Sequence, residues 1–95
     1  MEAAIARATM PVTFYDCDFE GVDLSRLDIS GFAFERCTVI DADMSHIVAT
    51  GSVWKGCRAR KASLRGADLG DARVDAGDWN NTDWQGARIS GMHIR

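Results

Sequence analysis

A period of five residues runs through the sequence from Val12 to its last residue. When this stretch is divided into consecutive blocks of five, the third place of all seventeen blocks is apolar. The third-place residues are Phe14, Phe19, Leu24, Ile29, Phe34, Val39, Met44, Ala49, Trp54, Ala59, Leu64, Leu69, Val74, Trp79, Trp84, Ile89 and Ile94. A period of five fits neither an α-helix, with about 3.6 residues per turn, nor the two-residue alternation of a strand. It predicts a chain path that returns to the same inward face every five residues.

The other places of the block favour a square solenoid in which each block forms one side. The first place is small or apolar in nearly every block, with Ser52, Gly77 and Thr82 as mild exceptions. A tight turn at each corner needs a positive φ, which glycine adopts without strain and Asn or Asp tolerates. The last place supplies such residues at Gly21, Gly31, Gly51, Gly56, Gly66, Gly86 and Gly91, and also at Asn81, Asp16, Asp41 and Asp71. Four sides close one coil, so we expect residues twenty apart to lie above one another.

The block pattern resembles that of the pentapeptide-repeat family, whose consensus block is A-(D/N)-L-X-X. The blocks ADLGD (67–71) and ASLRG (62–66) match it closely, and VDLSR, TDWQG and GDWNN keep its frame. The resemblance covers about Val12 to Arg95 and implies an all-β fold, a right-handed quadrilateral β-helix of about four coils. Residues 12–95 would form this β-helix. Residues 1–11 would form an N-terminal cap of one or two helical turns that Pro11 ends, or else a frayed tail.

Three cysteines take the first, inward place of their blocks at intervals of twenty residues, which is one coil: Cys17, Cys37 and Cys57. They are expected to form a buried structural ladder, with stacked rungs about 4.8 Å apart. That spacing lies within the range of a disulfide, but parallel side chains in a narrow core leave little room for its dihedral angle. A disulfide and a metal site are the alternatives, and buried free thiols are the main interpretation.

Composition gives little sign of a membrane or secreted protein. No apolar run approaches the roughly 18 residues that cross a bilayer, and MEAAIARATMP lacks the pattern of a secretory signal. With an odd number of cysteines and no export signal, we expect a protein of the reducing bacterial cytoplasm.

The net charge is −3, and the two signs are unevenly placed along the chain. A candidate acidic face comprises Asp16, Asp18, Glu20, Asp23, Asp43 and Asp83, where Asp23, Asp43, Ser63 and Asp83 would form one column at intervals of twenty residues. A candidate basic patch in the third coil comprises Lys55, Arg58, Arg60, Lys61 and Arg65. Charged runs of this size are also typical of an ordinary solvated surface.

Catalysis is not expected from this sequence. Ser45 and His46, with Asp43 nearby, suggest a hydrolase, but all three take outward places in one block where no cleft is expected. The glycines are scattered at corners and form no phosphate-binding loop, and no ligand set for a metal is apparent. We therefore expect no enzyme activity and no cofactor.

The sequence best fits a rigid module that binds another protein without catalysis, or a scaffold. Well-known relatives of the family carry long acidic columns, mimic DNA and bind DNA gyrase, so an acidic DNA mimic is the first alternative. A scaffold domain of a larger multidomain or translocated protein is the second. Ile89, Met92 and Ile94 are candidate contacts for an end-to-end homodimer. Direct binding to nucleic acid or membrane is not expected, and the partner's identity is not encoded in any motif.

Overall fold

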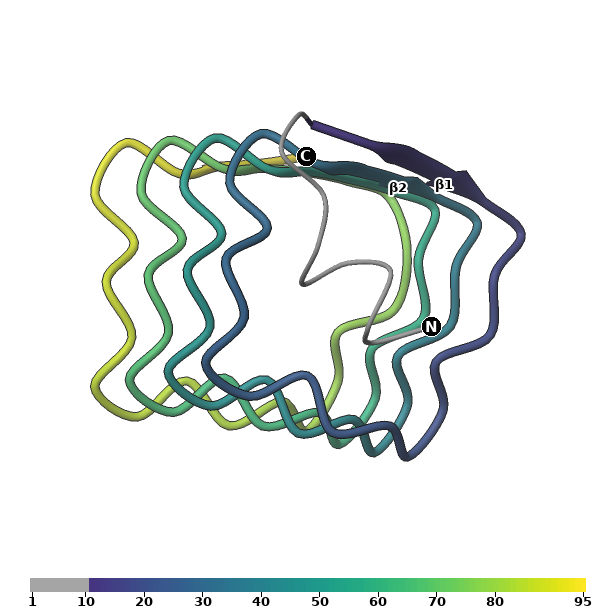
Figure 1. Cartoon of the computed structure of the whole chain (residues 1–95), viewed down its shortest axis with the longest axis horizontal. Coiled ribbons are helices and arrows are strands. Elements are labelled where there is room, and N and C mark those ends of the chain that lie inside the picture. Colours follow the sequence, from purple (N-terminus) through teal and green to yellow (C-terminus); the bar gives the residue numbers. More distant parts are fainter. Residues whose placement is uncertain (1–10) are drawn as a thin grey trace.

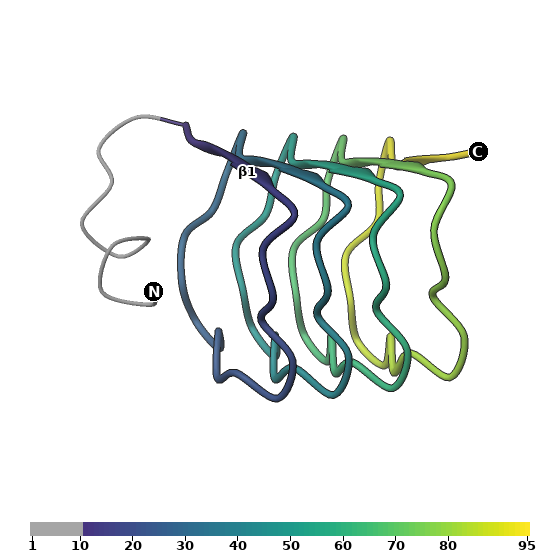
Figure 2. The same ribbon diagram turned by 90° about the vertical axis from the view of Figure 1, so that its right-hand side faces the viewer.

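A computed structural model describes residues 11–95, which wind into stacked square coils (Figure 1). Seen from the side, the coils follow one another in chain order from the N-terminal to the C-terminal end (Figure 2). The predicted N-terminal cap falls on residues outside this range, except for the exposed Pro11. None of the described residues, 11–95, form a helix that could span a bilayer.

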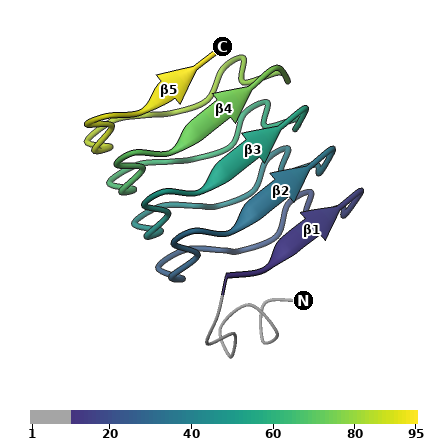
Figure 3. The same ribbon diagram turned by 90° about the horizontal axis from the view of Figure 1, so that it is seen from above.

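Five short strands form one parallel sheet in the order β1-β2-β3-β4-β5 (Figure 3). Their bounds are β1 Thr13–Tyr15, β2 Ala33–Glu35, β3 Val53–Lys55, β4 Arg73–Asp75 and β5 His93–Ile94. Phe14 pairs with Phe34, and Phe34 with Trp54, so the register advances by one coil of twenty residues. Isolated parallel bridges keep the same offset on the other three sides, as between Asp18 and Thr38. The predicted quadrilateral β-helix is confirmed.

The four sides of the coil are named here by the blocks that form them. The strand face carries β1 to β5. The second, third and fourth faces follow it in chain order. Their first coil supplies residues 17–21, 22–26 and 27–31, and each later coil adds twenty to these numbers.

The core is made by the third-place residues, as the five-residue period predicts. From Phe19 to Val74 every one of them is buried. On the strand face Phe14, Phe34 and Trp54 stack in a row, with ring centroids 5.4 Å and 4.1 Å apart. Small first-place residues leave room for Trp54, whose indole N–H donates to the buried Ser52 hydroxyl at 2.8 Å. Ser52 is thus a satisfied core residue rather than a break in the pattern.

The two other exceptions at the first place also have a structural cause. The Thr82 hydroxyl donates to the Trp79 and Ala59 carbonyl oxygens, at 2.6 Å and 3.1 Å. A Cβ at Gly77 would collide with the Cys57 carbonyl oxygen in the coil below. This position accordingly requires glycine, and its φ of +96° favours glycine as well.

Every corner residue from Asp16 to Gly91 has a positive φ. The seven corner glycines, Asn81 and the three corner aspartates adopt it as the sequence predicts. Five further residues that sequence reasoning did not single out do so too: Arg26, Arg36, His46, Lys61 and Ala76. The hydrogen-bond register between neighbouring coils sets the backbone conformation at these corners. It does so even where a side chain disfavours a positive φ, which costs about 1–2 kcal/mol per residue.

Candidate interaction surface

All seven second-place aspartates cap the backbone of their own block. On the second to fourth faces, the N–H of the fourth-place residue finds no backbone acceptor within residues 11–95. In seven blocks the Oδ1 of the aspartate two residues earlier accepts it instead, at 2.9–3.1 Å. The seven are Asp18, Asp23, Asp28, Asp43, Asp68, Asp78 and Asp83. Such turns give the recurrent aspartate a structural role besides its charge.

The candidate acidic face therefore has carboxylates with several different roles. Asp23 and Asp43 bridge in parallel, one above the other, and each also accepts a serine hydroxyl at 2.6 Å. Hydrogen bonds from the Ser25 hydroxyl and N–H lower the pKa of Asp23. Asp83 lies in the same column, but it has Arg65 at 3.4 Å.

The first coil holds the other acidic candidates. Asp16 pairs with Arg36 of the next coil at 2.9 Å, while Asp18 caps the Glu20 N–H and Glu20 is exposed. The second face thus begins with two carboxylates, and Arg58 lies two coils later in the column that Asp18 starts.

The candidate basic patch extends over three faces of the third coil. Lys55 lies on the strand face, Arg58, Arg60 and Lys61 on the second face, and Arg65 on the third. Arg60 pairs with Asp78 at 3.3 Å, and Arg65 with Asp83. Within residues 11–95, Lys55, Arg58 and Lys61 make no ion pair. The second face therefore presents two cations that remain available to a partner.

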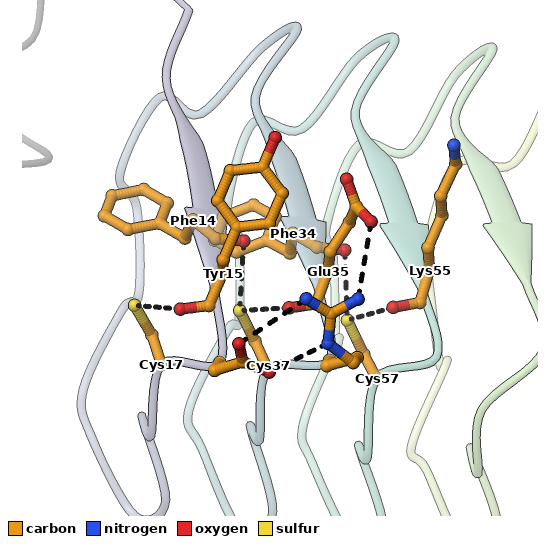
Figure 4. A network of polar contacts seen from close by, with 10 residues as sticks. Phe14, Tyr15, Cys17, Phe34, Glu35, Cys37, Lys55 and Cys57 are labelled. Atoms are coloured by element: carbon orange, nitrogen blue, oxygen red, sulfur yellow. Dashed lines mark hydrogen bonds and ion pairs between the residues drawn. The ribbon is translucent and has the colours of Figure 1, made fainter.

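The three cysteines stack above one another next to the strand face and are free thiols (Figure 4). Each thiol donates weakly to a backbone carbonyl, Cys57 to Phe34 at 3.3 Å. Cys17 is partly exposed at the start of the row, whereas Cys37 and Cys57 are buried. Burial raises the pKa of the Cys37 thiol and that of Cys57 to about 11, so Cys57 is held as an unreactive thiol.

Within residues 11–95, no hydrogen bond joins the His46 side chain to Ser45 or Asp43. The Ser45 hydroxyl donates to Asp43, and the His46 imidazole lies against Gly66 of the next coil, where a Cβ would come within 2.6 Å of it. Among residues 11–95 no group of three or more His, Cys, Asp or Glu side chains is placed to hold a metal ion.

The C-terminal end of the described coil exposes apolar side chains. Ile89 and Ile94 are 53% and 68% exposed, and Met92 is partly buried against the core. Trp79 and Trp84 are also partly exposed there. β5 pairs with β4 alone, so its outer edge is open in residues 11–95.

One cluster escaped the sequence analysis. The ladder places Arg73, His93 and Arg95 on the strand face near Lys55, where they line one hollow. These residues are far apart in the sequence and lie in three different blocks. Spacings of twenty and forty residues, once the five-residue frame is known, are the signal that relates Arg73 to His93 and Lys55 to Arg95.

Comparison with known proteins points to one family. The family model described as pentapeptide repeats (8 copies) matches residues 40–74. No curated protein matches the sequence significantly.

Solved structures with the same fold are pentapeptide-repeat proteins. Rfr23 from the cyanobacterium Cyanothece 51142 superposes with a TM-score of 0.79 at 15% identity, over 87% of this chain. The chain spans only 56% of that protein's length. A pentapeptide-repeat protein of the Arabidopsis thaliana thylakoid lumen gives a TM-score of 0.61 at 20% identity, over 97% of this chain and 68% of that one.

Trypsin-treated QnrB1, a plasmid-mediated fluoroquinolone resistance protein, aligns more weakly. Its TM-score is 0.43 at 20% identity, over 90% of this chain and 48% of that one. The family match shows pentapeptide repeats over residues 40–74, and the shared β-helix shows that the chain has the fold of pentapeptide-repeat proteins.

Proposed function

We propose that the chain is a protein-interaction module that works without catalysis. The observation that carries this proposal is the second face, where Arg58 and Lys61 make no ion pair within residues 11–95. Both project from a backbone held on each side by parallel coils, as in the bond from the Arg58 N–H to the Cys37 carbonyl oxygen at 3.0 Å. A rigid surface loses little entropy on binding, and unpaired cations favour a partner with an acidic surface.

The test is affinity capture from bacterial lysate at low and high salt, with mass spectrometry of the retained proteins. An Arg58→Ser/Lys61→Ser variant should lose a partner that the natural chain retains. Arg88→Ser is the matched control, because Arg88 is an exposed cation on the fourth face beside Asp68. Equal retention by all three proteins would contradict the proposed surface.

The second proposal is an acidic DNA mimic that engages DNA gyrase. Its support is the stacking of Asp23 on Asp43, although Arg65 lies beside the third carboxylate of the column, Asp83. An Asp23→Asn/Asp43→Asn/Asp83→Asn variant separates the two proposals, since Asn keeps an oxygen for each backbone cap and removes the charge. Loss of a captured gyrase subunit from this variant alone would favour the mimic. If this variant captured the same partner as the natural chain, the result would favour binding through the second face.

We also propose that two chains pair end to end at the C-terminal coil. The exposed Ile89 and Ile94, next to the open edge of β5, support an isologous contact. Light scattering should give a dimer mass for the natural chain and a monomer mass for Ile89→Lys. A monomer mass for the natural chain at high concentration would overturn the pairing.

A further inference from the structure

The strand face carries a hollow of about 350 Å³ at the C-terminal end of the sheet. Side chains of β3, β4 and β5 and the following Arg95 line it, and Figure 3 shows these three strands side by side. The parallel register sets Lys55 next to Asp75, and Arg73 next to His93. The Arg95 N–H donates to the Val74 carbonyl oxygen at 2.9 Å, which ties the last lining residue to the same ladder.

The lining of this hollow is cationic and its charges are unpaired. Lys55, Arg73 and Arg95 take part in no ion pair within the part of the chain that the structure describes. Asp75 is the one acidic side chain in the lining, so the side chains there carry a formal charge of 3 − 1 = +2 with His93 neutral. Several unpaired cations around one hollow favour an anion held by more than one group.

A second hollow provides a contrast. It lies at the corner after the third face, and Ser45, His46, Arg65 and Gln85 line it. Its polar groups are already engaged: Arg65 donates to Gln85 at 2.7 Å and lies beside Asp83, and Ser45 donates to Asp43. Of these two hollows in residues 11–95, the one on the strand face is lined by cations that make no ion pair.

We propose that the strand-face hollow binds the phosphomonoester group of a small molecule. A phosphomonoester carries about −1.5 to −2 charge near neutral pH, which complements the +2 of the lining. Arg73 and Arg95 supply guanidinium forks that match phosphate oxygens, with Lys55 as a third cation. His93 contributes a ring N–H, and Val53 gives the carbon part of the ligand an apolar contact.

The size of the hollow sets the class of ligand. Its volume lies near the lower end of the roughly 300–1,000 Å³ found for small-molecule sites, which suits one phosphorylated metabolite. This site goes beyond the proposed interaction function and rests on different residues, since Arg58 and Lys61 lie on the next face. Either proposal can fail while the other stands.

The test is a titration of the ¹⁵N-labelled full chain with phenyl phosphate, followed by amide NMR shifts. We expect saturable shifts centred on Lys55, Arg73 and His93. Arg73→Ser should weaken binding by about tenfold or more, because it removes a charge-assisted pair. Arg58→Ser is the matched control, an unpaired cation outside the hollow, and should leave the dissociation constant within about twofold, as expected for a screened charge on another face.

Three results would overturn the proposal. The first is an absence of saturation, or an equal loss in the Arg58→Ser protein, which would indicate general attraction to a basic surface. The second is equally tight binding of benzenesulfonate, which carries one charge and no ester phosphate. The third is tighter binding of a phosphoserine peptide than of phenyl phosphate, which would assign the site to a modified protein rather than a small molecule.

Discussion

The carboxylate of Asp68 accepts the N–H of Gly70 at 3.0 Å, and Gly70 is buried. No other acceptor reaches that N–H within residues 11–95. An aspartate that looks like surface charge in the sequence therefore satisfies the backbone donor of a buried residue. The same geometry recurs in six other blocks, so the aspartates of this fold should be assessed as caps before they are assessed as binding residues.

Asp68→Ala should lower the free energy of unfolding by about 1 kcal/mol, because it leaves a buried N–H without an acceptor. The melting temperature should fall by roughly 4–8 °C for a domain of this size. Asp68→Asn keeps the accepting oxygen and should stay within about 0.5 kcal/mol of the natural chain. Equal losses in the two variants would show that the carboxylate acts through its charge.

Ala76→Gly should stabilise the coil. Ala76 is a corner residue with a φ of +58°, and glycine relieves that strain at a smaller entropic cost, for a net gain of about 0.5–1 kcal/mol. Ala62→Gly is the matched control, since Ala62 is fully buried at an inward place and does not have a positive φ. Thermal unfolding should show a rise for the first variant and a fall for the second. A fall for both would contradict the corner assignment.

The three thiols should differ in reactivity. A short iodoacetamide pulse at about pH 8 should modify the partly exposed Cys17 first, because burial leaves Cys57 with a pKa of about 11 and little thiolate. Mass spectrometry of the labelled peptides reports the order, and labelling in urea confirms that all three can react. If Cys57 were labelled as fast as Cys17 in the folded protein, the buried core around Cys57 would have to open to solvent.

Acid should destabilise the fold through Asp23 and Asp28. Hydrogen bonds from Ser25 and Ser30 lower the pKa of these two carboxyls in the folded state. A lowered pKa contributes stability above the unfolded value of about 3.9, and that stability is lost as the pH falls through the folded value. The melting temperature of an Asp23→Asn/Asp28→Asn variant should therefore fall less steeply below about pH 4. If the melting temperatures of the variant and the natural chain fell equally steeply with pH, Asp23 and Asp28 would not contribute to the acid destabilisation.

The fold follows from the sequence because the place of a residue in its five-residue block predicts whether its side chain is buried. Phe19 and Leu64 could be assigned to the core from their place in the block alone. The strained corners could not be found this way, since nothing about Arg26 or Ala76 as a residue favours a positive φ. At those two corners the backbone conformation is imposed by hydrogen bonds between neighbouring coils.

The surface was harder to predict than the core. The frame shows that Arg73 and His93 share a column, but whether a cation has a partner depends on side-chain rotamers that the sequence does not specify. Arg60 finds Asp78, whereas Arg58 on the same face pairs with no carboxylate within residues 11–95. The aspartate caps could not be predicted for a related reason. Only the hydrogen bonds between coils show that the N–H of the fourth-place residue has no backbone acceptor.

One pair of substitutions tests the central claim, that place in the five-residue block decides which side chains point inward. Leu64 is 1% exposed, and its neighbour Ser63 takes the outward place between Asp43 and Asp83. Circular dichroism with thermal melting should show Leu64→Asp unfolded, since an unpaired buried carboxylate is too costly for a domain of this size. Ser63→Asp should keep the fold with a melting temperature within about 4 °C of the natural chain, because it adds an aspartate where other blocks already have one. A folded Leu64→Asp protein, or an unfolded Ser63→Asp protein, would contradict the frame.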